Sequence, residues 1–99
     1  MDKEEVKLVG PIVRDPDMAD ALIAVIEEDN PGTEVIIDDR GGYVRIHTPW
    51  RCRITRRTLE EVLGRSITLS QIEPELVSFA GRMRYVGDDE IIFFLERED

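Results

Sequence analysis

The stretch PELVSFAGRMRYVGDDEIIFFLE, residues 74–96, decides the fold because it predicts the last β-hairpin of the chain. Two segments rich in β-branched and aromatic residues flank the turn Gly87-Asp88-Asp89, which is typical of two antiparallel strands. Alternation along the first strand predicts one set of side chains in the core and another outside. The core-facing set is Val77, Phe79, Met83 and Tyr85, and the outward set is Ser78, Ala80, Arg82 and Arg84.

Two helices are predicted upstream of this hairpin. Residues 15–29 begin at Asp15, a residue suited to capping, and apolar side chains then recur at helical spacing. Residues 58–63 form a shorter helix, for which Thr58 and Glu61 predict a capping box.

Strands are predicted over residues 6–14, 33–48 and 50–56. The first is interrupted by Gly10-Pro11, which indicates an edge position or a break, because proline cannot donate to a β-ladder. The second contains Gly41-Gly42 near its middle and reads as a hairpin. We expect this hairpin and the third strand to form a three-stranded meander with arginines on its solvated face.

The expected order of elements is therefore β-α-β-β-β-α-β-β. This order is typical of the α+β class, with a mostly antiparallel sheet of about six to seven strands covered by two main helices. The length of 99 residues fits one domain spanning 1–99, and residues 1–5 are expected to be a flexible N-terminus.

The composition argues against several classes of partner. A net charge of −9 disfavours nucleic acid, because phosphates favour clustered Lys and Arg. No apolar run approaches the roughly 20 residues that span a bilayer. The charged start lacks the apolar centre of a secretory signal, so a cytoplasmic location is expected. Residues 44–68 nevertheless carry six arginines against two acids, which indicates either a docking face or an ordinary solvated surface.

Catalytic and metal chemistry find little support in the sequence. One cysteine and one histidine cannot supply the usual four ligands of zinc. Strand alternation places Cys52 in the core and His47 on the opposite side, so a nucleophilic Cys–His pair is not expected. We predict no cofactor and no catalytic residue, and expect a protein that acts by contacting another macromolecule. A stand-alone acidic interaction module, such as an inhibitor or adaptor, and a small enzyme with a carboxylate site stay open as alternatives.

Several segments carry a resemblance to a known family. They are VGPIVR (9–14), EEDNPGTEV (27–35), YVRI (43–46), TLEEVLGR (58–65), ELVSFAGRM (75–83) and DDEIIFFLE (88–96). In this order and spacing the chain resembles the effector, or coupling, proteins of soluble diiron monooxygenases. The branch it looks most like is that of the toluene-type aromatic monooxygenases.

The resemblance implies a non-catalytic component that binds a hydroxylase near its diiron site. Such a component shifts the conformation of the hydroxylase and couples electron transfer and O2 activation to hydroxylation, acting indirectly with a reductase or ferredoxin.

The residues that we expect at the contact are small or polar. They are Asn30, Arg45, Arg51, Arg53, Ser78, Ala80, Gly81 and Arg82. As a contact residue, Gly81 should accept a large side chain without loss of stability. The alternative is that Phe79 is simply core and that Gly81 is a bulge or a tight packing site.

Overall fold

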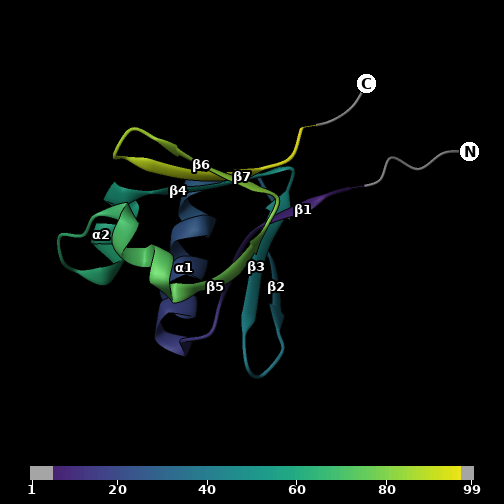
Figure 1. Ribbon diagram of the computed structural model, residues 1–99, viewed down its shortest axis with the longest axis horizontal. Helices are drawn as coiled ribbons and strands as arrows, with labels where there is room; N and C mark the ends of the chain where they lie inside the picture. The colour runs from purple at the N-terminus through teal and green to yellow at the C-terminus, as the bar shows by residue number, and fades with distance from the viewer. Residues whose placement is uncertain (1–5, 97–99) are drawn as a thin grey trace, which may run out of the picture.

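The computed structural model describes residues 6–96 (Figure 1). The elements in chain order are β1 (Leu8–Val13), α1 (Pro16–Asp29), β2 (Ile36–Asp39), β3 (Val44–Pro49), β4 (Arg51–Thr55), α2 (Arg56–Leu63), the 3-10 helix η1 (Leu69–Glu75), β5 (Leu76–Ala80), β6 (Arg82–Val86) and β7 (Glu90–Phe94). The strand pairs among these residues are antiparallel, which confirms the α+β class. The flexible N-terminus expected over 1–5 lies outside the described residues.

The strands form two sheets, ordered β2-β3-β1-β5 and β4-β7-β6. Figure 1 shows the second sheet across the top of the molecule, with the first sheet below it. The hairpin predicted over 33–48 is confirmed, but the three-stranded meander is wrong, because β4 pairs with β7. The chain leaves the first sheet after Pro49 at Trp50, whose φ of 65° is rare for a bulky residue.

The first strand of the predicted last hairpin, residues 76–86, is divided at Gly81. This glycine has a φ of 90°, and a Cβ added to it would lie 2.7 Å from Cγ1 of Val9 and 3.0 Å from the carbonyl oxygen of Phe94. Glycine alone combines that backbone angle with so close an approach. The chain therefore bends here, pairs with β1 as β5, and then pairs with β7 as β6.

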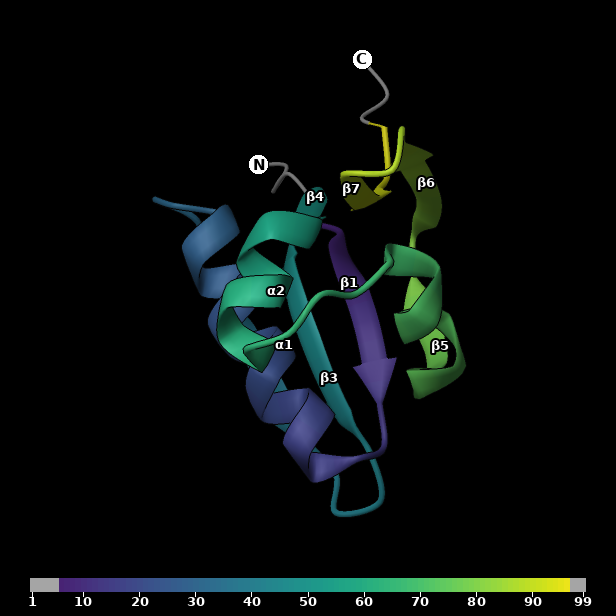
Figure 2. The same cartoon turned by 90° about the vertical axis from the view of Figure 1, so that its left-hand side faces the viewer.

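Both helices cover the same side of β1 and β3 (Figure 2). Asp15 caps α1 as predicted, since its carboxylate accepts a hydrogen bond of 2.9 Å from the Met18 amide. The buried face of α1 includes Leu22, Val25 and Ile26. Each fully buried aliphatic side chain of this kind contributes roughly 1.5–3 kcal/mol.

The start of α2 differs from the capping box that the sequence predicts. The helix begins at Arg56 with Thr55 as its N-cap, and the Thr55 hydroxyl accepts from the Thr58 amide at 3.2 Å. Thr58 does not cap the helix because its own hydroxyl donates to the Asp29 carboxylate at 2.7 Å. The predicted end at Gly64 is confirmed by its left-handed backbone.

The bend at Gly81 gives a stability prediction. Gly81→Ala and Gly87→Ala both place a side chain at positive φ, but a Cβ at Gly87 meets no atom within 4 Å. The difference in melting temperature between the two variants therefore reports the cost of the close approach to Val9 and Phe94. Overpacking costs about 1–3 kcal/mol, so Gly81→Ala should melt at least about 4–8 °C below Gly87→Ala. Equal melting temperatures in a thermal scan would show that the packing tolerates a side chain there.

Candidate docking surface

The two groups most capable of nucleophilic or base chemistry are separated and unsuited to it. Cys52 is fully buried in the core, as predicted, and burial raises the pKa of its thiol to about 12. His47 lies on the other sheet, and its pKa is lowered by burial and then by the nearby charge of Arg45. No group of three or more His, Cys, Asp or Glu side chains within residues 6–96 is placed to hold a metal ion. No helix in that range is long and apolar enough to cross a membrane.

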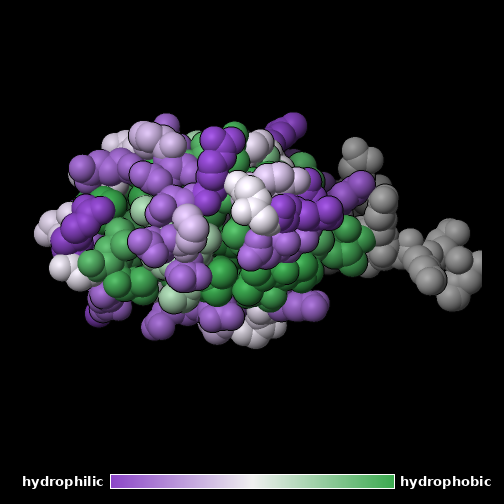
Figure 3. All heavy atoms as spheres, turned by 90° about the horizontal axis from the view of Figure 1, so that it is seen from below, coloured by the Kyte–Doolittle hydropathy of each residue, from purple (hydrophilic) through white to green (hydrophobic). Residues whose placement is uncertain are grey.

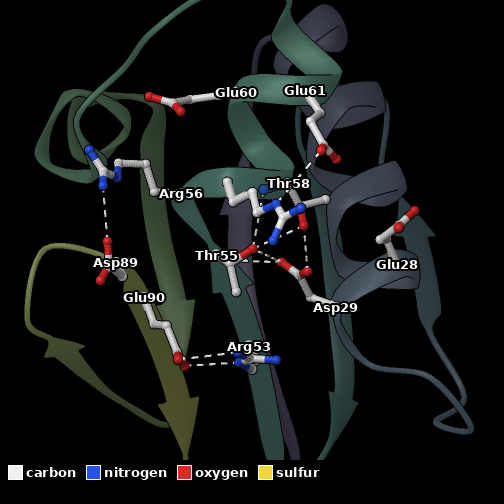
Figure 4. A pocket seen from close by; sticks show the side chains of 11 residues that line it. Glu28, Asp29, Arg53, Thr55, Arg56, Thr58, Glu60, Glu61, Asp89 and Glu90 are labelled. Atoms are coloured by element: carbon white, nitrogen blue, oxygen red, sulfur yellow. Dashed lines mark hydrogen bonds and ion pairs between the residues drawn. The ribbon is translucent and has the colours of Figure 1, made fainter.

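A polar hollow of about 760 Å³ lies between the end of α1, the start of α2 and the strands β4 and β7. Figure 4 shows Asp29 pointing toward Thr55 and Thr58 inside it. The Asp29 carboxylate accepts hydrogen bonds from the Thr55 amide at 2.7 Å and from the Thr58 hydroxyl at 2.7 Å. This carboxylate therefore ties α1 to the first turn of α2.

Two of the arginines of this hollow, Arg53 and Arg56, are paired with acids of the hairpin between β6 and β7 (Figure 4). Arg53 donates to both carboxylate oxygens of Glu90, at 2.9 and 3.1 Å, and these hydrogen bonds lower the pKa of Glu90. Arg56 donates to Asp89 at 3.0 Å. These pairs use the charges of Arg53 and Arg56 within the fold, where they join β4 and the start of α2 to the β6–β7 hairpin.

Asn30, one of the predicted contact residues, has a structural role. Its side-chain amide donates to the carbonyl oxygens of Ile26 at 2.8 Å and Arg53 at 2.9 Å. Its side-chain oxygen accepts from the Arg53 amide at 3.0 Å. Three of its four hydrogen-bonding positions are thus used to join α1 to β4, which leaves little for a partner.

Three other predicted contact residues share the outer face of the first sheet, the face opposite α1. The cross-strand register aligns Arg45 of β3 with Ile12 of β1, and Ile12 with Ser78 of β5. Ala80 pairs with Gly10 on the same face. The guanidinium of Arg45 lies over the Tyr43 ring at 5.5 Å. The structure therefore brings Arg45, Ser78 and Ala80 together.

The remaining arginines lie on the outer face of the second sheet. Arg51 and Arg82 both pair with Phe94 across their strands, and Arg53 is in line with Ile92 and Arg84. The predicted set is thus divided between two faces that belong to different sheets. Gly81 lies at the junction between them, where it is a packing residue.

The apolar side chains of β5 and β6 are more exposed than the alternation predicts. Val77 is 45% exposed, Phe79 38% and Tyr85 37%, although all three were expected in the core. Phe79 contacts the buried Phe93, with 5.6 Å between ring centroids, and yet keeps this exposed fraction. We call Val77, Phe79 and Tyr85 the β5–β6 apolar patch. Sequence reasoning missed it because alternation gives the face of a strand but not whether a neighbour covers that face.

Apolar side chains are also exposed outside the β5–β6 apolar patch. Figure 3, the view from below, shows a band of apolar side chains crossing the molecule between hydrophilic ones. The β5–β6 apolar patch differs in its position at the edges of both sheets, since β5 and β6 each end a sheet. Figure 2 shows these two strands at the same side of the molecule.

Known proteins are similar to this chain in sequence and fold. Residues 7–94 match the MmoB/DmpM family. The effector subunit of the alkene monooxygenase system of Xanthobacter autotrophicus is 52% identical over 83 residues, which are 84% of this chain and 82% of that subunit. Two solved structures of a phenol hydroxylase–regulatory protein complex contain chains of 26% identity, with TM-scores of 0.76 and 0.71. The alignments cover 93% and 92% of this chain and 100% of each matched chain.

The environment of His47 predicts a pH dependence of stability. Its Nε2 atom is buried, and no group of residues 6–96 hydrogen-bonds to it, so the neutral imidazole is favoured. Because its pKa is lower in the folded chain than the ordinary value near 6.5, the unfolded chain binds the proton more readily. This contribution to stability is complete above pH ~6.5 and is lost as the pH falls through the folded pKa.

The measurement is the free energy of unfolding of the wild type and of His47→Gln between about pH 7.5 and 5. The wild type should lose stability across this window, and the variant should lose less. If the free energies of unfolding of the two proteins fell in parallel with pH, the prediction would be contradicted, because the loss of stability would then come from the acidic residues and not from His47.

Proposed function

Because this chain belongs to the MmoB/DmpM family, we propose that it is the effector of a multicomponent monooxygenase and acts by docking on the diiron hydroxylase component. Effector subunits of this family are regulatory proteins without catalytic activity of their own, which confirms the expectation of a non-enzyme. The observation that carries the proposal is the 52% identity to an effector subunit over more than four-fifths of both chains. The match to the regulatory protein of a phenol hydroxylase complex also supports it.

The proposed action is a shift in the conformation of the hydroxylase. A bound protein shifts an equilibrium only when it binds one conformation better than another. A difference of about 1–3 kcal/mol between the two conformations gives a roughly 5–150-fold change in their ratio. We infer that docking near the diiron site uses this difference to couple electron delivery, from a reductase or ferredoxin, and O2 activation to hydroxylation.

The β5–β6 apolar patch is the part of the surface that we assign to docking. Exposed valine and aromatic side chains at the edges of two sheets offer apolar area that a partner can bury. Burying such a side chain contributes roughly 1.5–3 kcal/mol, and aromatic residues are frequent hot spots. Ser78 and Ala80 lie on the opposite face of β5, the face that Arg45 of β3 shares across β1, and we propose these three residues as a second part of the contact.

The relatives suggest a class of substrate for the partner hydroxylase. Those named above belong to an alkene and a phenol system, and the resemblance in the sequence favours a toluene-type system. All three substrates contain carbon–carbon double bonds or an aromatic ring. We propose an unsaturated or aromatic hydrocarbon as the substrate, with the whole chain acting as one effector domain in the cytoplasm.

Activation of the hydroxylase tests this function. The purified chain is added in equal amount to the hydroxylase with its electron donors, and product formed per electron consumed is measured. We expect this ratio to rise. No rise, with no binding to the hydroxylase, would instead favour a stand-alone acidic interaction module.

A matched pair of variants tests the docking surface. Val77→Glu places a charge within the β5–β6 apolar patch, and Ile37→Glu places the same charge at a similarly exposed position of β2, since Ile37 is 46% exposed. We expect Val77→Glu to raise the Kd for the hydroxylase at least about tenfold, or ~1.4 kcal/mol. Ile37→Glu should leave the Kd unchanged, and both should keep the wild-type melting temperature. Equal Kd values for the two variants would place the contact elsewhere.

A further inference from the structure

We propose that the outer face of the second sheet is a receptor for acidic side chains of the hydroxylase, an inference that rests on the proposed function. This face carries Arg51 and Arg53 from β4 and Arg82 and Arg84 from β6, on either side of the central strand β7. We call these four residues the arginine face. The contact expected from sequence contained three of them and lacked Arg84.

Within residues 6–96, three of the four arginines of the arginine face make no ion pair with a carboxylate. Of the cross-strand partners in the register, only Glu90 is acidic, and it is bound to Arg53. No carboxylate of residues 6–96 lies within 4.0 Å of a guanidinium nitrogen of Arg51, Arg82 or Arg84. The whole chain has 22 acids and 13 bases, so a cluster of arginines without an ion pair to any carboxylate of residues 6–96 does not follow from its composition.

The packing of the arginine face also keeps its guanidinium groups at the surface. Ile92, at its centre, is 2% exposed although it points away from the core, because its cross-strand neighbours are the long side chains of Arg53 and Arg84. Arginine stems cover apolar surface while their heads stay in water. The guanidinium of Arg84 stacks over Phe94 at 5.2 Å. Such stacking orients a planar fork that binds carboxylates with two hydrogen bonds.

Repulsion within the arginine face favours an acidic partner. Neighbouring strands lie ~4.8 Å apart, so arginines on either side of β7 are separated by roughly 10 Å. This is close to the screening length at physiological ionic strength, about 8 Å, and the charges therefore still repel one another. Carboxylates brought in by a partner relieve this repulsion and speed association. A nucleic acid offers anions too, but the net charge of −9 opposes its approach.

The experiment compares two double variants that change the net charge equally. Arg51→Glu/Arg82→Glu alters the arginine face, while Arg14→Glu/Arg65→Glu alters exposed arginines outside it. The association rate with the hydroxylase is measured by stopped flow at ionic strengths of about 0.02 M and 0.5 M. We expect the first variant to associate at least about tenfold more slowly than the second at low ionic strength. The two rates should converge at high ionic strength.

The outcomes separate this inference from the proposed function. Equal rates for the two double variants, with wild-type binding intact and still weakened by Val77→Glu, would overturn the arginine face alone. If the wild type neither binds nor activates the hydroxylase, the proposed function fails as well. A third outcome is that the wild type binds DNA or phosphatidylserine vesicles and that Arg51→Glu/Arg82→Glu does not. This result would assign the arginine face to a different anion and overturn the proposal.

Discussion

The close approach of the Gly81 backbone to Val9 and Phe94 is the constraint on which the rest of the surface depends. There is no room for a Cβ at this point, and the positive φ turns the chain from one sheet into the other. One continuous strand would have paired along its whole length with a single partner. The bend instead makes β5 and β6 the edge strands of two sheets. It thereby leaves Val77 and Phe79 open on one strand and aligns Arg82 and Arg84 on the next.

A second set of contacts holds the helices in register with this bent framework. Asp29 and Asn30, adjacent at the end of α1, bond to the start of α2 and to the backbone of β4. Arg53 and Glu90 then join β4 to β7. These bonds use polar groups that line the hollow between α1, α2, β4 and β7, so this part of the hollow strengthens the fold. Surface side chains, rather than the lining of this hollow, are left to contact a partner.

The sequence predicts local features well here and non-local features poorly. The capping of α1 by Asp15, the left-handed end of α2 at Gly64 and the inward position of Cys52 depend on a few neighbouring residues, and all are confirmed. Which strand pairs with which depends on distant residues, so β4 was expected beside β3 although it pairs with β7. The same limit explains Asn30, whose amide was read as a surface group because its partner, Arg53, lies 23 residues away in sequence.

The two surfaces differ in the physical term that each supplies to binding. Apolar contacts such as those of Val77 and Phe79 act at short range and mainly set the rate of dissociation. Charges such as those of the arginine face act across a screening length and mainly set the rate of association. The chain as a whole has a net charge of −9, whereas the arginine face is positive. The electric field of an acidic partner therefore attracts this face and orients it toward the partner. Arg82 follows β5 after the single residue Gly81, so the same bend that opens the apolar patch places the steering charges beside it.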